Sequence, residues 1–114
     1  MHELSVTQGL VDMLIEEAEK RKVKKVTKVT VVIGELTGIE SESVKFYFDI
    51  LTENTVAEGA ELNFKIIKAQ FKCTECGNIF ERSNFTFKCP VCGGQGVLMS
   101  KKGKEFYIES IEVE

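Results

Sequence analysis

Apolar residues recur every three to four positions across residues 4–22, which predicts an amphipathic helix. Its apolar stripe consists of Leu4, Val11, Leu14, Ile15 and Ala18. Basic residues follow at the C-terminal end of this segment, where the helix macrodipole favours positive charge. A second helix is predicted from residue 41 onwards, because Ser41 to Ser43 can cap it. Its shared apolar face consists of Val44, Tyr47, Phe48 and Leu51.

Three other segments follow the pattern of β-strands. Residues 26–35 are rich in β-branched side chains and end at Gly34, and the apolar run from Val29 to Ile33 predicts burial on both faces. Residues 62–67 alternate between apolar and polar positions and lead directly to Cys73. Residues 106–113 alternate again, but the phase changes near Ser110, which indicates a bulge or a bend.

These elements predict an α+β fold, with a small mixed three-stranded sheet, two helices and an inserted lobe that resembles a zinc ribbon. Residues 1–69 and 104–114 form the α/β domain in this interpretation, and residues 70–103 form the lobe. Such a short lobe has little other core, so its aromatic side chains are expected to cover the metal site. These side chains are Phe80, Phe85 and Phe87.

Length and composition narrow the class of protein. A chain of 114 residues is long enough for one domain, or for a small domain that carries a metal-held lobe. Its net charge of −3 gives the whole molecule no bias toward nucleic acid. The sequence contains no run of 18 apolar residues and no secretory signal pattern. We therefore expect a cytoplasmic protein without a membrane span.

Two cysteine pairs are the strongest chemical signal in the chain. Cys73 and Cys76 form the first Cys-x2-Cys motif, and Cys89 and Cys92 form the second. Two such turns can supply the four ligands of a tetrahedral Zn²⁺. A glycine follows each pair, at positions 77 and 93, where a positive φ would direct backbone N–H groups at the sulfurs. In a reducing compartment paired cysteines indicate metal ligands, and two disulfides are the alternative.

The N-terminus offers a second group of potential metal ligands. His2 is the only histidine and directly follows Met1, which we expect to be retained because the second residue is large. The amine of Met1, the imidazole of His2 and the amide nitrogens of His2 and Glu3 lie within three residues. Such nitrogen ligands suit a square-planar Ni²⁺ or Cu²⁺. The alternative is an incidental histidine at a frayed terminus.

Both features, together with the intervening pattern, resemble the HypA/HybF family of hydrogenase nickel-incorporation proteins. The resemblance spans essentially the whole chain. It rests on Met1-His2-Glu3, the strand end at Gly34-Glu35, Phe48-Asp49, Val56 to Ala60, the two cysteine pairs and the closing strand at Ile108 to Val113.

The resemblance implies a metallochaperone without catalytic activity, which delivers Ni²⁺ during assembly of nickel–iron hydrogenase and in some relatives serves urease. It implies nickel ligation by the Met1 amine, the His2 imidazole and amide nitrogen and the Glu3 amide nitrogen. It also implies a structural Zn²⁺ on Cys73, Cys76, Cys89 and Cys92. The implied partners are the maturation GTPase HypB and the hydrogenase large subunit, with the chain itself a monomer or weak homodimer.

Other functions remain as alternatives. A nucleic-acid-binding or protein-docking zinc ribbon would need basic residues on the lobe, and the lobe contains Lys72, Arg82, Lys88, Lys101 and Lys102. A rubredoxin-like electron carrier is a further possibility, because iron also accepts four cysteines. Enzymatic activity has the least support, since Glu3, Glu35 and Glu40 lack an accompanying histidine or nucleophile.

A basic cluster follows the first helix. It consists of Lys20, Arg21, Lys22, Lys24, Lys25 and Lys28. We interpret it as a solvated helix end, with a docking patch for an acidic partner as the alternative.

Overall fold

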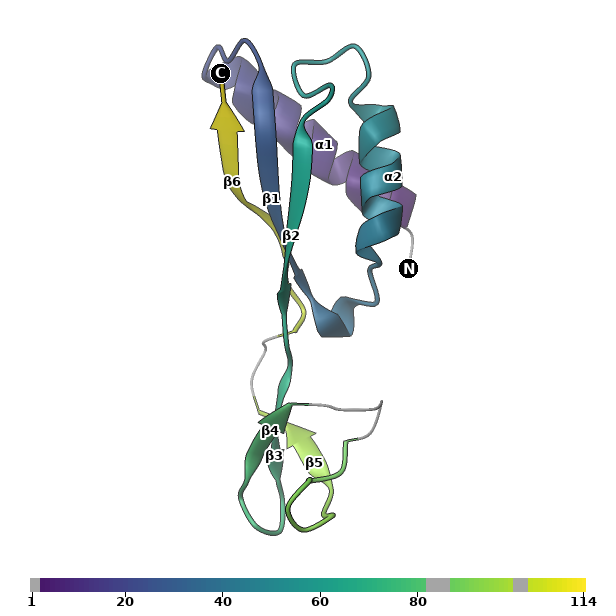
Figure 1. Cartoon of the computed structure of the whole chain (residues 1–114), viewed down its shortest axis with the longest axis vertical. Helices are drawn as coiled ribbons and strands as arrows, with labels where there is room; N and C mark the ends of the chain where they lie inside the picture. Colours follow the sequence, from purple (N-terminus) through teal and green to yellow (C-terminus); the bar gives the residue numbers. More distant parts are fainter. Residues whose placement is uncertain (1–2, 82–86, 100–102) are drawn as a thin grey trace.

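The computed structural model describes residues 3–81, 87–99 and 103–114. The molecule is elongated, with extents of 55 × 23 × 17 Å, and carries a helical part at one end and a small β-lobe at the other (Figure 1). The elements in chain order are α1 (Glu3–Lys20), β1 (Val26–Gly34), the short 3-10 helix η1 (Glu35–Thr37), α2 (Ser41–Leu51), β2 (Glu61–Ile67), β3 (Gln70–Cys73), β4 (Ile79–Glu81), β5 (Gly96–Leu98) and β6 (Phe106–Val113).

The larger sheet has the strand order β2-β1-β6, with β1 parallel to β2 and antiparallel to β6. This arrangement confirms the predicted mixed three-stranded sheet. Val29, Val31 and Ile33 of the central strand belong to the core shared with the helices. Val32 points to the opposite face and is also fully buried. The prediction that this strand is buried on both faces is therefore confirmed at Val32 only, because Thr30 on the same face is half-buried.

A bulge in β6 explains the phase change near Ser110. Thr30 of β1 pairs with Ser110, but the next residue of β1, Val31, pairs with Ile108, so Glu109 is an extra residue. Ile108 and Ile111 are separated by an odd number of positions and would face opposite sides of a regular strand. The bulge lets both side chains pack against the same core.

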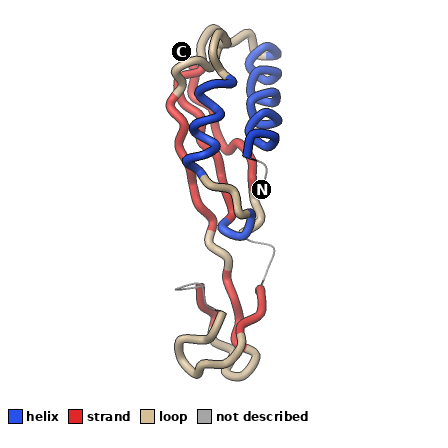
Figure 2. Tube along the Cα trace, turned by 90° about the vertical axis from the view of Figure 1, so that its right-hand side faces the viewer, coloured by secondary structure: helices blue, strands red, loops and turns tan. Residues whose placement is uncertain are grey.

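Both longer helices contribute to this core, with α1 behind the sheet and α2 along its β2 side (Figures 1 and 2). The buried side chains of α1 are Thr7, Leu10, Val11, Leu14 and Ala18. Leu4 was predicted to join this stripe, and the structure contradicts that prediction, because its side chain is 50% exposed. The helix crosses the sheet obliquely and begins beyond the β2 side, where no strand covers its first turn (Figure 1).

The ends of the helices also differ from the prediction. The first helix ends at Lys20 instead of residue 22, since Lys22 adopts a left-handed φ of 53° and the Val23 amide donates back to the Ala18 carbonyl. In α2 the N-cap is Glu40, without a side-chain capping bond, and Ser41 is the first helical residue. The predicted serine cap is therefore wrong. Neither helix in the described part of the chain is long and apolar enough to cross a membrane.

The lobe contains a second antiparallel sheet, in the order β4-β3-β5, which sequence patterns did not predict. Its core centres on Phe71, whose ring lies 6.0 Å from that of Phe80 and 5.1 Å from that of Phe87, measured between centroids. Phe80 is buried beside the cysteines, while Phe87 is partly exposed. The third predicted core aromatic, Phe85, lies outside the described residues.

The two parts of the molecule meet where Gly34 passes the backbone of Gly103. A Cβ atom on Gly34 would collide with the Gly103 carbonyl group. The Leu36 amide donates to the Gly103 carbonyl at 2.7 Å, and the Glu35 carboxylate accepts a hydrogen bond from the Ala69 amide at 2.8 Å. The Leu36 side chain packs against the core of the lobe. Side-chain and backbone contacts thus both join the lobe to the helical part.

Candidate metal centre

Two similar turns at the tip of the lobe carry the four cysteines. The first turn follows β3 and the second precedes β5. The glycine after each pair, Gly77 or Gly93, has a φ of 76°, as the sequence predicted. The amide of each glycine donates to the carbonyl of the first cysteine of its pair, at 3.1 Å in the first turn and 2.9 Å in the second. The positive φ therefore closes both turns in the same way.

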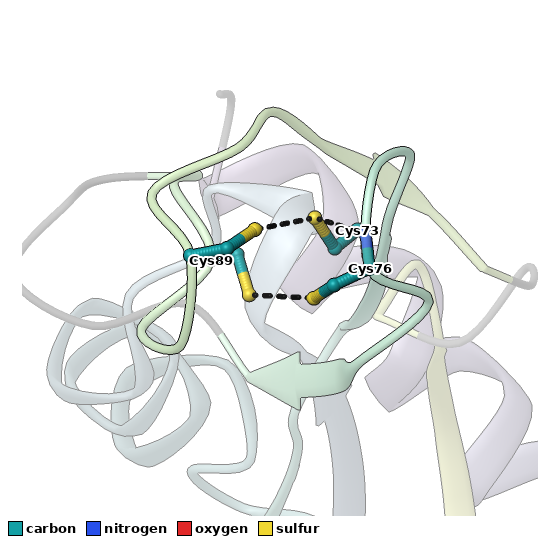
Figure 3. Close-up of side chains that lie close together, drawn as sticks. Cys73, Cys76 and Cys89 are labelled. Atoms are coloured by element: carbon teal, nitrogen blue, oxygen red, sulfur yellow. Dashed lines mark hydrogen bonds between the residues drawn. The ribbon is translucent and has the colours of Figure 1, made fainter.

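The sulfur atoms of the four cysteines converge, and all lie within 4.8 Å of one another. Cys73 Sγ lies 3.4 Å from Cys92 Sγ, and Cys76 Sγ lies 3.6 Å from Cys89 Sγ. Figure 3 shows side chains from the two turns pointing toward each other. Zn–S bonds of 2.3 Å would place tetrahedral sulfurs about 3.8 Å apart. The four cysteines are free, and their sulfurs lie close enough together to share one metal ion.

Backbone amides point at the sulfurs, as predicted from the paired turns. The amides of Glu75 and Cys76 donate to Cys73 Sγ at 3.4 and 3.5 Å. The Val91 amide donates to Cys89 Sγ at 3.4 Å, and the Gly94 amide donates to Cys92 Sγ at 3.4 Å. Such N–H···S bonds stabilise thiolates and fix the orientation of metal ligands.

These contacts divide the four cysteines into two groups, in which the thiol pKa is shifted in opposite directions. Backbone N–H groups of Cys76 and Glu75 hold the pKa of the Cys73 thiol below its usual value. Burial raises the pKa of Cys89, but hydrogen bonds from Cys92, Val91 and the Asn78 side chain outweigh burial and lower it to about 6. In the metal-free protein, the buried thiols of Cys73 and Cys89 are therefore expected to lose their protons before the exposed thiols of Cys76 and Cys92.

The two exposed cysteines behave in the opposite way. The Gly94 amide favours the Cys92 thiolate, but the neighbouring sulfurs of Cys73 and Cys76 outweigh it and raise the pKa of Cys92 to about 12. For Cys76 the Asn78 backbone and the Cys92 side chain favour the thiolate, yet burial and the sulfurs of Cys89 and Cys73 leave its pKa raised. Each exposed thiol lies beside a buried sulfur whose pKa is lowered, and a divalent cation would replace the protons that the four thiols still hold.

Sequence reasoning missed two further contributors to this centre. The Asn78 amide group donates to Cys89 Sγ at 3.6 Å from the end of the first turn, although only Gly77 had been singled out there. A Cβ atom on Gly94 would lie 2.9 Å from Cys73 Sγ and 2.7 Å from the Glu75 carboxylate. The second turn therefore approaches the first so closely that position 94 has no room for a side chain. No motif in the sequence identifies either contact.

The predicted nickel ligands Met1 and His2 lie outside the described residues. Glu3 opens α1 in the helical part, and its carbonyl accepts a hydrogen bond from the Thr7 hydroxyl at 2.6 Å. The four cysteines lie in the lobe at the far end of the long axis (Figure 1). The structure therefore places Glu3 and the cysteine cluster in different parts of the molecule.

Three of the six basic side chains in the cluster after α1 form ion pairs. Lys20 pairs with Glu16 at 3.4 Å, Arg21 with Glu17 at 2.6 Å and Lys28 with Glu112 at 3.6 Å. These exposed pairs are typical of a solvated helix end and contribute little to stability. The remaining members, Lys22, Lys24 and Lys25, have no ion-pair partner within the described ranges.

Comparisons with known proteins place the chain among nickel-handling proteins. Residues 1–113 match the family model described as "Hydrogenase/urease nickel incorporation, metallochaperone, hypA". The chain is 92% identical over 114 residues to "Hydrogenase maturation factor HypA" of Caldanaerobacter subterraneus subsp. tengcongensis, with both sequences fully covered. It is 44% identical to the protein of the same name in Dehalococcoides mccartyi, which covers all of this chain and 95% of that protein.

Solved structures show the same fold. The solution structure of the Ni metallochaperone HypA from Helicobacter pylori matches with a TM-score of 0.64 and 26% identity, over 99% of this chain and 97% of that one. A second match is titled "Solution structure of HypA protein", with a TM-score of 0.67 and 26% identity, over 100% and 97%. The α+β architecture agrees with these structures.

Proposed function

Because the chain belongs to the HypA family of hydrogenase/urease nickel-incorporation metallochaperones, we propose that it binds Ni²⁺ at its N-terminus and delivers it during maturation of nickel–iron hydrogenase. The observation that carries this proposal is the family match, which extends over residues 1–113. Delivery to urease is a second possible destination of the nickel, because the description of the family includes both enzymes.

The proposed nickel ligands are the amine of Met1, the imidazole and amide nitrogen of His2 and the amide nitrogen of Glu3. Four nitrogen ligands in a plane select Ni²⁺ over Zn²⁺ through geometry. His2 supplies the only imidazole of the chain, so no other histidine competes for the metal. A site at the chain terminus can release its cargo without unfolding the core.

The proposed resident metal is Zn²⁺, held by Cys73, Cys76, Cys89 and Cys92. The converging sulfurs support this proposal, because four thiolates at tetrahedral spacing form a closed structural site. A bound Zn²⁺ would link the two turns, while the backbone amides and Asn78 hold the thiolates in place. Lobes of this size usually depend on their metal for folding.

We also propose a division of labour along the chain. Residues 1–69 and 104–114 would form the nickel-binding domain, and residues 70–103 the zinc-binding lobe. The GTPase HypB and the hydrogenase large subunit are the proposed partners, in the cytoplasm. The two separate buried clusters support a division of this kind, with Ala69 and Leu36 of the first domain packed into the cluster of the lobe.

Nickel titration of the untagged, zinc-loaded chain tests the proposal. His2→Ala should abolish tight nickel binding and leave about one zinc per chain. Glu3→Pro and Glu3→Ala form a matched pair, since both remove the carboxylate but only proline removes the ionisable amide proton. Proline is tolerated at the first position of a helix, so α1 should survive. Nickel binding should be lost in Glu3→Pro and retained in Glu3→Ala; stoichiometric binding by His2→Ala would refute the assignment.

A further inference from the structure

The sheet of the lobe has one face that turns away from its own core. Phe71 of β3 points to the inner face, where it belongs to the buried cluster of the lobe. The next residue, Lys72, pairs with Ile79 of β4 on one side and with Val97 of β5 on the other. Side chains alternate along a strand, and directly paired residues point to the same side of a sheet. Lys72, Ile79 and Val97 therefore lie together on the outward face.

Met99 extends this outward face. Its amide donates to the Gln70 carbonyl at 2.9 Å, which continues the pairing of β5 with β3 by one residue, and it lies two positions after Val97 on the same side. The side chains of Ile79, Val97 and Met99 are 51%, 50% and 47% exposed. These three residues and Lys72 are called here the outward patch. Exposed apolar side chains that gather on one face indicate an interaction surface.

Charge indicates what kind of partner this surface fits. Residues 68–104 contain seven Lys or Arg and two Glu, whereas the remaining residues contain eight basic and sixteen acidic side chains. A Zn²⁺ on four thiolates would add two negative charges and still leave the lobe positive. Lys72 is exposed and forms no ion pair with a described residue, while Glu81, two residues after Ile79, adds one negative charge to the same face. A positive lobe with an apolar patch complements an acidic surface that also exposes apolar side chains.

We infer that the outward patch is a docking site for the apolar face of an acidic amphipathic helix on another protein. Strands lie about 4.8 Å apart, so the three strands offer a face about 10 Å wide, which matches the width of one helix. Apolar side chains one helical turn apart would cover Val97 and Met99 on β5 and Ile79 on β4, and a carboxylate would pair with Lys72.

A helix suits this surface better than an added strand. The edge strands β4 and β5 contain three residues each, and edges this short offer little backbone for pairing with a further strand. The patch is small, so we expect weak binding that salt reduces further. It belongs to the lobe, whereas α1 begins in the helical part (Figure 1). The inference therefore does not depend on the proposed nickel site.

Fluorescence anisotropy with a labelled peptide tests this docking site on the zinc-loaded full chain. The probe is a helical peptide with leucine at every third or fourth position and glutamate and alanine elsewhere, and its control carries lysine in place of each glutamate. The acidic peptide should bind saturably, and the basic peptide should bind about tenfold more weakly, because it meets a positive lobe. Absence of saturable binding of the acidic peptide, or equal binding of both peptides, would overturn the inference.

Substitutions in the outward patch locate the contact. Val97→Ser should weaken binding of the acidic peptide about tenfold, whereas Val113→Ser, at a valine that is 51% exposed in the helical part, is the matched control and should not. Lys72→Glu should weaken binding of the acidic peptide and strengthen binding of the basic one. Glu81→Gln should have the opposite effect to Lys72→Glu, and Lys25→Glu, at an exposed lysine of the helical part, should have neither effect. Wild-type binding by Val97→Ser and Lys72→Glu would contradict the proposed contact; zinc content and circular dichroism establish that each variant is folded.

Two other ligands of a basic, apolar surface are outcomes of the same assay. Single-stranded DNA and vesicles of phosphatidylglycerol are titrated under identical conditions. Neither should bind as tightly as the acidic peptide, because neither presents an apolar helix face to Val97. Tighter binding of DNA or of vesicles, lost in Lys72→Glu, would replace the helix as the occupant and overturn the inference.

Discussion

Replacing Gly34 by alanine should disrupt the junction between the lobe and the helical part, because the added Cβ atom has no room there. The φ of Gly34 is −80°, which any residue adopts, so alanine introduces no backbone strain there. The added Cβ, however, would collide with the carbonyl group of Gly103 and lie 2.5 Å from the Lys104 amide nitrogen. These neighbours are backbone atoms, which cannot rotate away as a side chain could.

The cost follows from the contacts that would have to open. The Gly34 amide donates to the Glu105 carbonyl at 2.7 Å, and the Leu36 amide donates to the Gly103 carbonyl at 2.7 Å. Each hydrogen bond contributes about 1 kcal/mol, and overpacking costs about 1–3 kcal/mol. We therefore expect Gly34→Ala to lower the free energy of unfolding by about 3–5 kcal/mol.

Urea denaturation followed by circular dichroism measures this loss, and limited proteolysis reports whether the junction opens. Gly9→Ala is the matched control, because a Cβ there meets no atom within 4 Å and position 9 lies inside α1. That variant should gain about 0.5–1 kcal/mol from helix propensity. The reasoning fails if Gly34→Ala is as stable and as protease-resistant as the wild type while Gly9→Ala behaves as expected.

Two predictions concern the cysteine centre. Cys73→Ser should loosen residues 70–103 and leave the helical signal in circular dichroism intact; a global loss of helix would contradict this. Zinc affinity, measured by chelator competition, should fall as pH falls, because near neutral pH binding displaces at least the protons of Cys76 and Cys92, whose pKa values are raised. Below pH 6 the dependence should steepen, since Cys89, with a pKa of about 6, also becomes protonated. A pH-independent affinity would show that these thiols do not carry the protons.

Local patterns predicted much of the fold, because hydrophobic periodicity reports which residues share a face. The strand at 106–113 illustrates this: the phase change near Ser110 indicated a bulge or a bend, and the structure has a bulge in which Glu109 is the extra residue. The same reasoning was wrong for Leu4, which lies on the correct face of α1 but in a turn that no strand covers. Periodicity identifies a face without saying what packs against it. The lobe strands were missed because three or four residues are too short to show a period.

The sequence by itself determined the metal-binding turns and the three strands of the larger sheet, since those depend on residues close together in the chain. Cys-x2-Cys followed by glycine, for example, closes the same turn twice. Only the tertiary structure revealed the contacts between residues that are distant in the chain. It brought Asn78 to Cys89, placed Gly34 against Gly103, and set Leu36 in the core of the lobe. The physical reason is that such contacts depend on where two chain segments cross, and no local spacing records that position.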